Sequence, residues 1–274
     1  MNEFLIKDLQ AFSISAAKTN TYFGSPDRKT EPHIHELCEI YVNITGNVSF
    51  VVEKNIYSVK SGDIIITRPY EYHHCVYHDN SDHIHYWIMF STDENPELFN
   101  FLTKKKLGHG NHIRLPEDQL SKFLMQCEKL VNADPSNRIA TMSTFFKIMS
   151  YIEDSIERYR VKDINENIPS NVKQILHYIN KNYTSIRSVN EIAEECFISI
   201  STIERYFKKY LSMTPKRYLE NKKLQKSCVL LRQNYSVTDA CFESGFDDYS
   251  HFITIFRKRF GTTPLKYKKG YDAK

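Results

Sequence analysis

Three histidines and one glutamate in the first third of the chain have the side chains of a metal site. One residue separates His33 from His35, and Glu39 follows four residues after His35. His74 lies further along the chain. On adjacent strands these side chains would offer three imidazoles and one carboxylate, a set that suits Fe, Mn, Ni or Zn. They could instead line a pocket for an organic molecule, or have only structural roles.

A second set of residues with a recognisable chemistry occurs twice in the last hundred residues. The aromatic start, the basic pair, the Thr-Pro step and the closing Tyr of 207–218 recur in 256–267, at an offset of 49 residues. A repeat of this size marks a duplicated supersecondary unit. Each copy follows a short helix and a tight turn, the pattern of a helix-turn-helix, whose second helix enters the major groove of DNA.

Exposed polar residues on the first turns of each second helix are the candidate base readers. They are Ser201, Thr202, Glu204 and Arg205 in the first unit, and Tyr249, Ser250, His251 and Thr254 in the second. Arg205 could bond guanine bidentately, and Glu204 could accept from a cytosine amino group. The phosphate candidates are Ser199, Lys208, Lys209, Arg257 and Lys258. Between the readers, the apolar residues Ile203, Phe207, Phe252, Ile255 and Phe256 are expected to point into the core.

Strands must position the polar residues of the first region. Short β-rich runs, separated by turn residues, cover 41–46, 48–52, 56–59, 64–67 and 84–90. Closely spaced antiparallel strands of this kind predict a small barrel or jelly roll. The expected fold class is therefore a two-domain chain: an N-terminal all-β jelly-roll barrel followed by helices, and a C-terminal all-α double helix-turn-helix.

Helical periodicity follows the strands. One apolar stripe runs through 120–131, and a stricter one through 142–159 has the heptad steps of a coiled coil. The 138–160 helix could therefore pair with its copy in a second chain, or pack on its own barrel. The polar segment 163–170 is the predicted linker. The expected domains are a barrel over 1–100, a helical dimerisation segment over 101–162, and a DNA-binding domain over 171–274 with units at 186–210 and 236–260.

Capping residues mark the helix starts of the last region. Ser188 and Glu191 form a capping box, and Thr214-Pro215 places proline at a first helical position. Thr263-Pro264 is expected to open the terminal helix, and Gly245 to make the turn of the second unit. The other expected N-caps are Ser170, Ser199, Ser236 and Asp247.

Charge divides the chain into an acidic and a basic part. Residues 171–274 contain 19 Lys and Arg against 10 Asp and Glu, a formal charge of +9, whereas the remainder has 18 against 23, or −5. A basic module joined to an acidic one fits a nucleic-acid binder tethered to a domain with another task. The six cysteines lack metal spacing and no apolar run suggests a signal peptide or a membrane span, so we expect a cytoplasmic protein.

Residues 171–270 resemble the DNA-binding domain of the AraC/XylS family of bacterial transcription regulators. The resemblance is strongest over 240–264, ACFESGFDDYSHFITIFRKRFGTTP, which is similar to the family's signature stretch. Phe197 departs from the usual turn glycine, Cys241 from a small alanine, and Thr254 from a basic residue on the second recognition helix. The second helix is therefore expected to read few bases and to act mainly through the DNA backbone.

His33, His35, Glu39 and Gly46 resemble the first motif of the cupin superfamily, and Gly62, Pro69 and His74 partly resemble the second, with Glu71 in place of a glycine. The AraC resemblance implies instead a cupin-like sensor barrel that binds a small molecule, often a sugar, without metal. We favour this interpretation, with no cofactor and with His33, His35, Glu39, His74, Tyr86 and Trp87 as pocket candidates. Tyr72 and Tyr77 could also stack on a sugar, although aromatic residues of a small barrel are usually core. The other histidines, His73, His78, His83, His85, His109 and His112, are expected on strand surfaces and in loops.

The sequence therefore predicts a non-enzymatic, sequence-specific transcription regulator. Its expected partners are double-stranded DNA, a small-molecule effector, a second copy of the chain and, if it is an activator, RNA polymerase. An effector would change how the barrel, the arm at 1–20 and the 138–160 helix pack. The alternatives are a metal-dependent cupin enzyme fused to a DNA-binding tail, and an effector-blind dimeric regulator.

Overall fold

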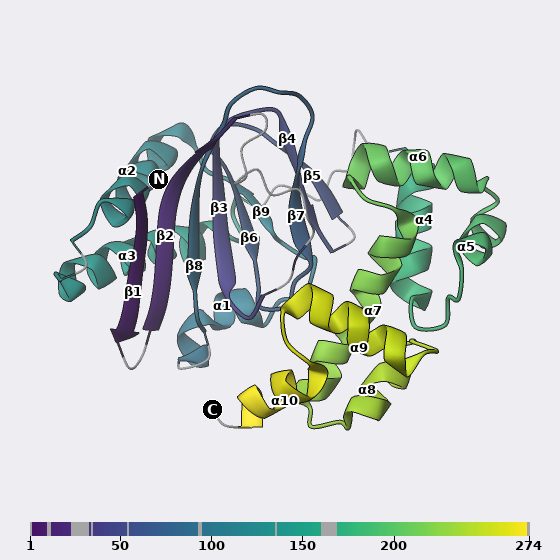
Figure 1. Ribbon diagram of the computed structural model, residues 1–274. Helices are drawn as coiled ribbons and strands as arrows, with labels where there is room; N and C mark the ends of the chain where they lie inside the picture. The colour runs from purple at the N-terminus through teal and green to yellow at the C-terminus, as the bar shows by residue number, and fades with distance from the viewer. Residues whose placement is uncertain are drawn as a thin grey trace. The chain divides into compact units, whose positions relative to one another are not determined.

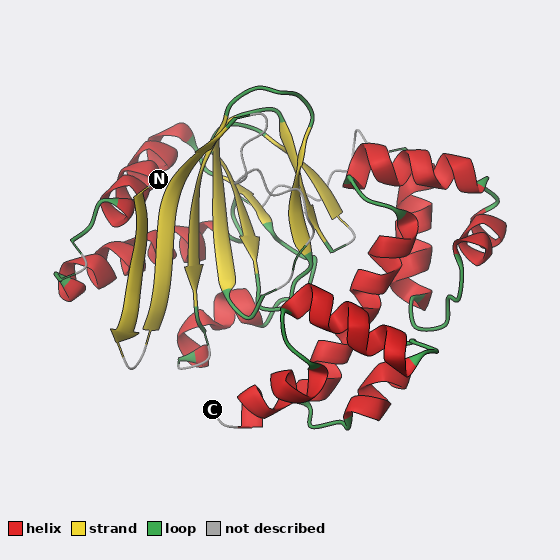
Figure 2. Ribbon diagram, viewed as in Figure 1, coloured by secondary structure: helices red, strands yellow, loops and turns green. Residues whose placement is uncertain are grey.

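Strands and helices occupy different parts of the chain (Figure 2). The computed structural model describes residues 2–9, 12–22, 33, 35–53, 55–92, 95–134, 136–159 and 169–272. The chain divides into two compact units, Met1–Asn167 and Ile168–Lys274. Every strand of the described residues belongs to the first unit, and only helices occur in the second (Figure 1). The expected two-domain fold class is confirmed.

Two antiparallel sheets form the first unit. The large sheet has the order β1-β2-β8-β3-β6-β9 and the small sheet β5-β4-β7. The strands of the large sheet are β1 (Asn2–Leu9), β2 (Phe12–Thr21), β8 (His83–Phe90), β3 (Cys38–Thr45), β6 (Asp63–Thr67) and β9 (His112–Arg114). Those of the small sheet are β5 (Asn55–Val59), β4 (Val48–Val52) and β7 (His73–Tyr77). The five expected strands are all present, whereas β1, β2, β7 and β9 were not predicted.

The two faces of the large sheet have different partners because side chains alternate along a strand. One face packs on α2 (Glu117–Val131) and α3 (Arg138–Ser155), with Ile40, Ile88 and Phe145 in the shared core. The other face meets the small sheet, where Tyr41 packs with Phe50. This second, inner face lies between the sheets and presents the polar residues of the candidate site. A short helical stretch, η1 (Pro96–Phe99) and α1 (Asn100–Thr103), follows β8.

One expectation for the first unit needs correction, and one of the two alternatives for the 138–160 helix is supported. Residues 2–9 and 12–21, expected to belong to an arm, form a hairpin in which β1 pairs with β2 and β2 pairs with β8. The heptad stripe of the 138–160 helix is used within the chain, since Phe145, Met149 and Ile152 are buried in its own core. The helix therefore packs on its own barrel. Of the predicted linker 163–170, residues 163–168 lie outside the described residues.

Seven helices of the described chain form the second unit. They are α4 (Ser170–Asn182), α5 (Val189–Cys196), α6 (Ile200–Leu211), α7 (Pro215–Arg232), α8 (Val237–Glu243), α9 (Tyr249–Phe260) and α10 (Pro264–Asp272). The expected caps of α5, α6, α7 and α8 are confirmed, because each cap side chain accepts a hydrogen bond from a backbone N–H three residues on. Two expected caps are wrong by one residue. Pro169, not Ser170, is the N-cap of α4, and Asp248, not Asp247, caps α9.

Candidate DNA-binding surface and ligand site

Helix α6 has one buried and one exposed face. Ile203 and Phe207 are fully buried and fix the helix on the core of the second unit. The Ser199 hydroxyl accepts from the Thr202 backbone N–H at 3.3 Å, which sets the start of the helix. Three of the four predicted base readers of this helix, Ser201, Glu204 and Arg205, are exposed, as are Lys208 and Lys209 of the phosphate set. Thr202 is half-buried, and its hydroxyl accepts from that of Ser199 at 2.9 Å.

Helix α9 repeats this arrangement with different surface chemistry. Phe252 and Phe256 are fully buried, whereas Ile255, expected to point inward, is only half-buried. The Thr254 hydroxyl donates to the Ser250 carbonyl at 2.9 Å, and the His251 Nε2 lies 3.5 Å from a Glu220 carboxylate oxygen on α7. All the predicted reading and phosphate residues of this helix are exposed: Tyr249, Ser250, His251, Thr254, Arg257 and Lys258.

A buried lysine that sequence reasoning missed joins the two helix-turn-helix units. Lys223 of α7 is 7% exposed, and its ammonium donates to the Ile186 carbonyl at 2.8 Å and to the Gly245 carbonyl at 2.7 Å. A Cβ on Gly245 would lie 2.4 Å from the Thr184 carbonyl oxygen, so only glycine permits this approach of the two units. The signal available in the sequence was a lysine among the buried positions of a helix.

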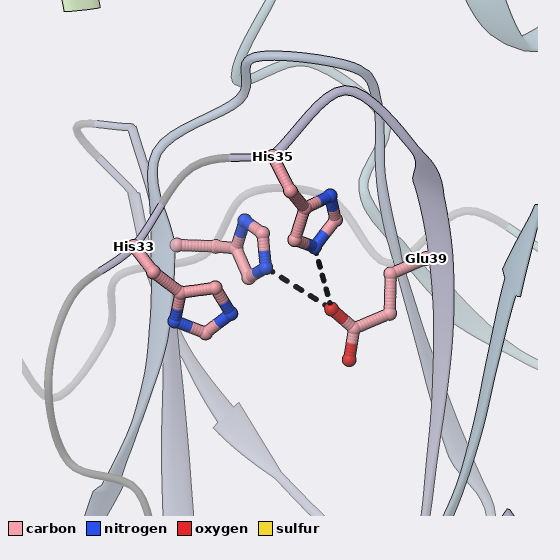
Figure 3. A group of neighbouring side chains, drawn as sticks. His33, His35 and Glu39 are labelled. Carbon is pink, nitrogen blue, oxygen red and sulfur yellow. Dashed lines mark hydrogen bonds and ion pairs between the residues drawn. The ribbon is translucent and has the colours of Figure 1, made fainter. Parts of the chain in front are cut away.

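In the first unit, His33, His35 and Glu39 point toward one another at one end of the barrel (Figure 3). The fourth member of this group is His73, and one ligand atom from each residue lies within 4.8 Å of the others. A Glu39 carboxylate oxygen is 3.1 Å from the Nε2 atoms of both His35 and His73. The cluster joins β3 of the large sheet to β7 of the small one.

His73, not His74, completes this cluster, which corrects the prediction. Both residues lie on β7, where alternation sends them to opposite faces. Cys75, two residues from His73, belongs to the core between the sheets. His74 is buried on the other side of the strand, with its ring 5.8 Å from that of Tyr72. Counting along the second motif from Pro69 gives a register one residue too far.

Hydrogen bonds within the cluster shift the pKa values of Glu39 and His73 in the direction that favours their charged forms. Burial raises the pKa of Glu39, but hydrogen bonds from His35 and His73 outweigh it and keep this pKa well below its usual range. Burial lowers the pKa of His73, and the hydrogen bond to Glu39 outweighs it, so this pKa is raised. The second ring nitrogens of His35 and His73 face backbone carbonyls, at 2.9 Å from Leu37 and 2.7 Å from Glu71.

A band of polar and aromatic side chains lies on the inner face next to this cluster. Strand pairing sets Tyr41 opposite Trp87 and Asn43 opposite His85. The Tyr41 hydroxyl lies 2.7 Å from the His83 Nε2 and donates to the Asn43 side-chain oxygen at 3.1 Å. Burial lowers the pKa of His85 to about 4, so this imidazole is neutral near pH 7. We call Tyr41, Asn43, His83, His85 and Trp87 the inner band.

Buried nitrogen atoms of the inner band lack a hydrogen-bond partner among the described residues. They are the Asn43 Nδ2 and the His85 Nδ1. The Trp87 indole N–H donates to the Thr19 hydroxyl of β2 at 3.1 Å. Buried polar atoms without a partner cost free energy unless a bound group satisfies them. The inner band can therefore form hydrogen bonds with a polar ligand, with the Asn43 amide as a donor.

The predictions for the other histidines and tyrosines of the first unit are partly correct. Tyr86, a predicted pocket residue, is on the opposite face of β8, where its hydroxyl donates to Glu128 of α2. His83 and His112, expected on the surface, are buried, as His73 is. His78 and His109 are exposed as expected. Tyr72 is buried, and the ring of half-buried Tyr77 lies 5.1 Å from that of His83.

Comparison with known proteins identifies both units. Residues 21–149 match the family model described as an AraC-like ligand-binding domain, and residues 192–270 match a helix-turn-helix domain. The chain is 26% identical over 261 residues to the HTH-type transcriptional activator RhaS of Enterobacter sp. (strain 638), covering 90% of this chain and 91% of that one. RhaS of Escherichia fergusonii is 24% identical, with 88% of each chain covered.

A solved structure also matches along the chain. ToxT from Vibrio cholerae O395 is 12% identical, covers 95% of this chain and 98% of its own, and has a TM-score of 0.37. A score this low supports no inference about this chain.

The two matched domains define a transcription regulator that combines a ligand-binding domain with a DNA-binding domain. The chain belongs to the AraC family of these regulators. No helix of the described residues is long and apolar enough to span a membrane.

Proposed function

We propose that this AraC-family regulator responds to a carbohydrate bound on the inner band. A sugar offers hydroxyl groups that both donate and accept hydrogen bonds, and apolar ring faces that stack on flat side chains. Asn43 has an unused donor and His85 an unused ring nitrogen, and Trp87 contributes the flat surface beside them. The unpaired polar atoms of this band are the observation that carries the proposal.

Thermal unfolding of the full chain against a panel of monosaccharides tests the effector. A sugar present at 100 times its Kd should raise the midpoint by roughly 5–10 °C. Asn43→Leu and Trp87→Leu should abolish that shift, whereas Tyr86→Phe, on the opposite face of β8, should retain it. An equal loss with Tyr86→Phe, or no shift with any sugar, would count against the inner band as a sugar site.

The two recognition helices are proposed to read DNA unequally. Arg205 and Glu204 carry the base readout on α6, while α9 contributes through Ser250, His251 and its basic last turn. Lys208, Lys209, Arg257 and Lys258 would bind phosphates. Successive major grooves lie about 34 Å apart on one face of the duplex, which fits two units on one connecting helix. Selection from a random duplex library identifies the operator, and enrichment of no motif would contradict specific binding.

Activation as a homodimer is proposed from the relatives. The similar RhaS proteins are named transcriptional activators. An activator of this kind acts by contacting RNA polymerase from its operator, and effector binding shifts the arrangement of the two units. Sedimentation of the chain with and without the sugar found above measures the dimer. A monomer under both conditions would leave the activator role but remove dimerisation from the mechanism.

The enzyme and effector-blind alternatives make different predictions for the His33 and His35 cluster. In a metal-dependent enzyme, His33→Ala and His35→Ala would abolish turnover together with bound metal. In a sensor they would alter the effector response and leave DNA affinity intact. An effector-blind regulator would bind its operator equally with and without every ligand of the panel. Operator binding of both variants, measured with and without sugar, separates the three.

A further inference from the structure

Strand β1 is an open edge of the large sheet. It has eight residues, Asn2–Leu9, and among the described strands it pairs with β2 alone (Figure 1). An edge strand leaves a row of backbone N–H and C=O groups outside the sheet, and these groups can pair with a strand of another chain. Proteins usually protect such an edge by keeping it short, by placing proline in it or by covering it.

The other sheet edges in the described part of the chain are shorter or covered. At the opposite end of the large sheet, β9 has three residues, and the Arg114 backbone N–H donates to the Tyr159 carbonyl at 3.1 Å. In the small sheet, β7 is bridged by His33, whose backbone exchanges hydrogen bonds of 3.0 and 3.1 Å with His73. The remaining edge strand, β5, has five residues. Strand β1 is therefore the longest edge on which a second chain could pair.

The sequence of β1 is nearly symmetric about its centre. Residues 4–6 are Phe, Leu and Ile, and the strand contains neither proline nor glycine. Glu3 and Lys7 flank this apolar centre at equal distances and carry opposite charges. The centre also lies in the regular part of the hairpin, because the irregular pairing with β2 falls between Ile6 and Leu9. A strand with this pattern is suited to antiparallel pairing with its own copy.

A two-fold axis through Leu5 gives the register in which the residue types of two β1 strands match. Leu5 then comes opposite itself, and Phe4 comes opposite Ile6 of the second copy. Glu3 comes opposite Lys7, so that opposite charges meet on both sides of the axis. Opposite-charge pairs and aromatic pairs with β-branched residues both stabilise a sheet, and each occurs twice here. A shift of the register by one residue in either direction would remove both charge pairs.

We propose that two copies of this chain associate through antiparallel pairing of their β1 strands. The two large sheets would then form one continuous sheet, since a two-fold contact uses the same surface on both copies. This inference rests on the homodimer proposed above and names its interface. The heptad stripe of α3 is not available for that role, because Phe145, Met149 and Ile152 are buried in the core of their own unit.

Cysteine cross-linking of the full-length chain tests the register. Opposite residues of antiparallel strands have Cα atoms about 4.5–5.5 Å apart, which a disulfide can bridge. Leu5→Cys should therefore give a disulfide-linked dimer on oxidation, because this residue meets its own copy. Phe4→Cys is the matched control and should give no more cross-linked dimer than the wild type, whose six cysteines are buried. Mixed with Ile6→Cys, it should cross-link. Equal yields from Leu5→Cys and Phe4→Cys would overturn the register.

Exchange of the flanking charges tests the same interface without oxidation. Glu3→Lys and Lys7→Glu should each raise the Kd of the dimer by roughly 10-fold, since two favourable cross-strand pairs become repulsive. An equal mixture of the two variants should recover the wild-type Kd, because every pair across the axis is again of opposite charge. Recovery in the mixture would also show that neither variant had lost its fold.

Sedimentation of the full-length chain over a concentration series measures these constants and separates two kinds of failure. A wild-type dimer whose Kd is unchanged in both charge variants would place the interface elsewhere, and the proposed homodimer would stand. A wild-type chain that stays monomeric throughout the series would overturn the homodimer together with this interface.

Discussion

The turns of the two helix-turn-helix units place different residues in the left-handed backbone position, a phenylalanine in the first and a glycine in the second. Phe197 and Phe246 are 49 residues apart, the offset of the repeat. Phe197 has a left-handed backbone, with φ of 56°, and is 93% exposed. In the second helix-turn-helix, Gly245 takes the left-handed position, with φ of 94°. Phe246 is only 6% exposed, and its ring packs on that of Phe252. The left-handed position is thus an exposed phenylalanine in the first turn and a buried glycine in the second, and the residue after that glycine enters the core.

The two recognition helices also differ at an exposed position while their buried positions stay apolar. Arg205 on α6 corresponds to Thr254 on α9 at the repeat offset, and both side chains are exposed. The buried positions keep their apolar character, since Ile203 and Phe207 correspond to Phe252 and Phe256. The duplication has therefore kept the scaffold and changed the surface. Four substitutions test this difference.

Gly245→Ala should have the largest effect. The new Cβ would lie 2.4 Å from the Thr184 backbone, and the φ of this position is +94°. We therefore expect the free energy of unfolding of the DNA-binding domain to fall by about 3 kcal/mol or more. Gly261→Ala is the matched control, because its φ is +67° and nothing lies within 4 Å of the added Cβ. That control should cost only about 1–2 kcal/mol. Urea unfolding measures both, and equal losses would show that the contact with Thr184 is unimportant.

Lys223→Met should come next. It keeps most of the side-chain length but leaves the carbonyls of Ile186 and Gly245 without the ammonium, at an expected cost of about 1–3 kcal/mol. Lys226→Met on the same helix should change the free energy of unfolding by less than about 0.5 kcal/mol. Urea unfolding compares the two, and similar values would remove Lys223 from the junction between the units.

Arg205→Ala should relax base specificity, whereas Thr254→Ala should not. Loss of a bidentate guanine contact costs about 1–3 kcal/mol at one base pair. The Thr254 hydroxyl already donates to its own helix, so its removal should leave the binding motif unchanged. Binding to the selected operator and to its single-base variants measures both proteins. A motif altered only by Thr254→Ala would reverse the proposed division between the helices.

Phe197→Gly should have the smallest effect and the opposite sign. The exposed ring contributes little packing, and glycine adopts the left-handed backbone without strain, so stability should rise by up to about 1 kcal/mol. Phe246→Gly should lower it instead, since that side chain is buried. Thermal unfolding distinguishes them, and destabilisation by Phe197→Gly would mean that the exposed ring has a partner.

Local signals in the sequence predicted much of this fold. Ser188, Ser199 and Thr214 cap helices because the capping side chain and the N–H that it binds are three residues apart. Apolar alternation likewise found β3 and β8. Strand β7 was missed because a run with two adjacent histidines does not alternate between polar and apolar residues.

The candidate site was predicted less completely because it depends on contacts between distant residues. Glu39 and its two histidines were identified from their spacing, but the fourth residue depends on the register of β7 against β4, where His73 lies opposite Val52. The partners of Lys223 are 37 and 22 residues away, and no local pattern indicates them. Tyr86 and Trp87 are adjacent on β8 and therefore point to opposite faces of the sheet. Tyr86 belongs to the core with the helices and Trp87 to the inner band, and the sequence alone does not say which face is which.

The adjacent histidines of β7 also affect how this barrel tolerates insertions and deletions. Deletion of one residue in the turn before β7 would shift the strand by one position and turn His74 toward Glu39 in place of His73. The imidazole at the cluster would survive an event that normally destroys a site. The same shift would move Cys75 out of the core between the sheets, so an imidazole beside Glu39 would be retained at a cost in packing.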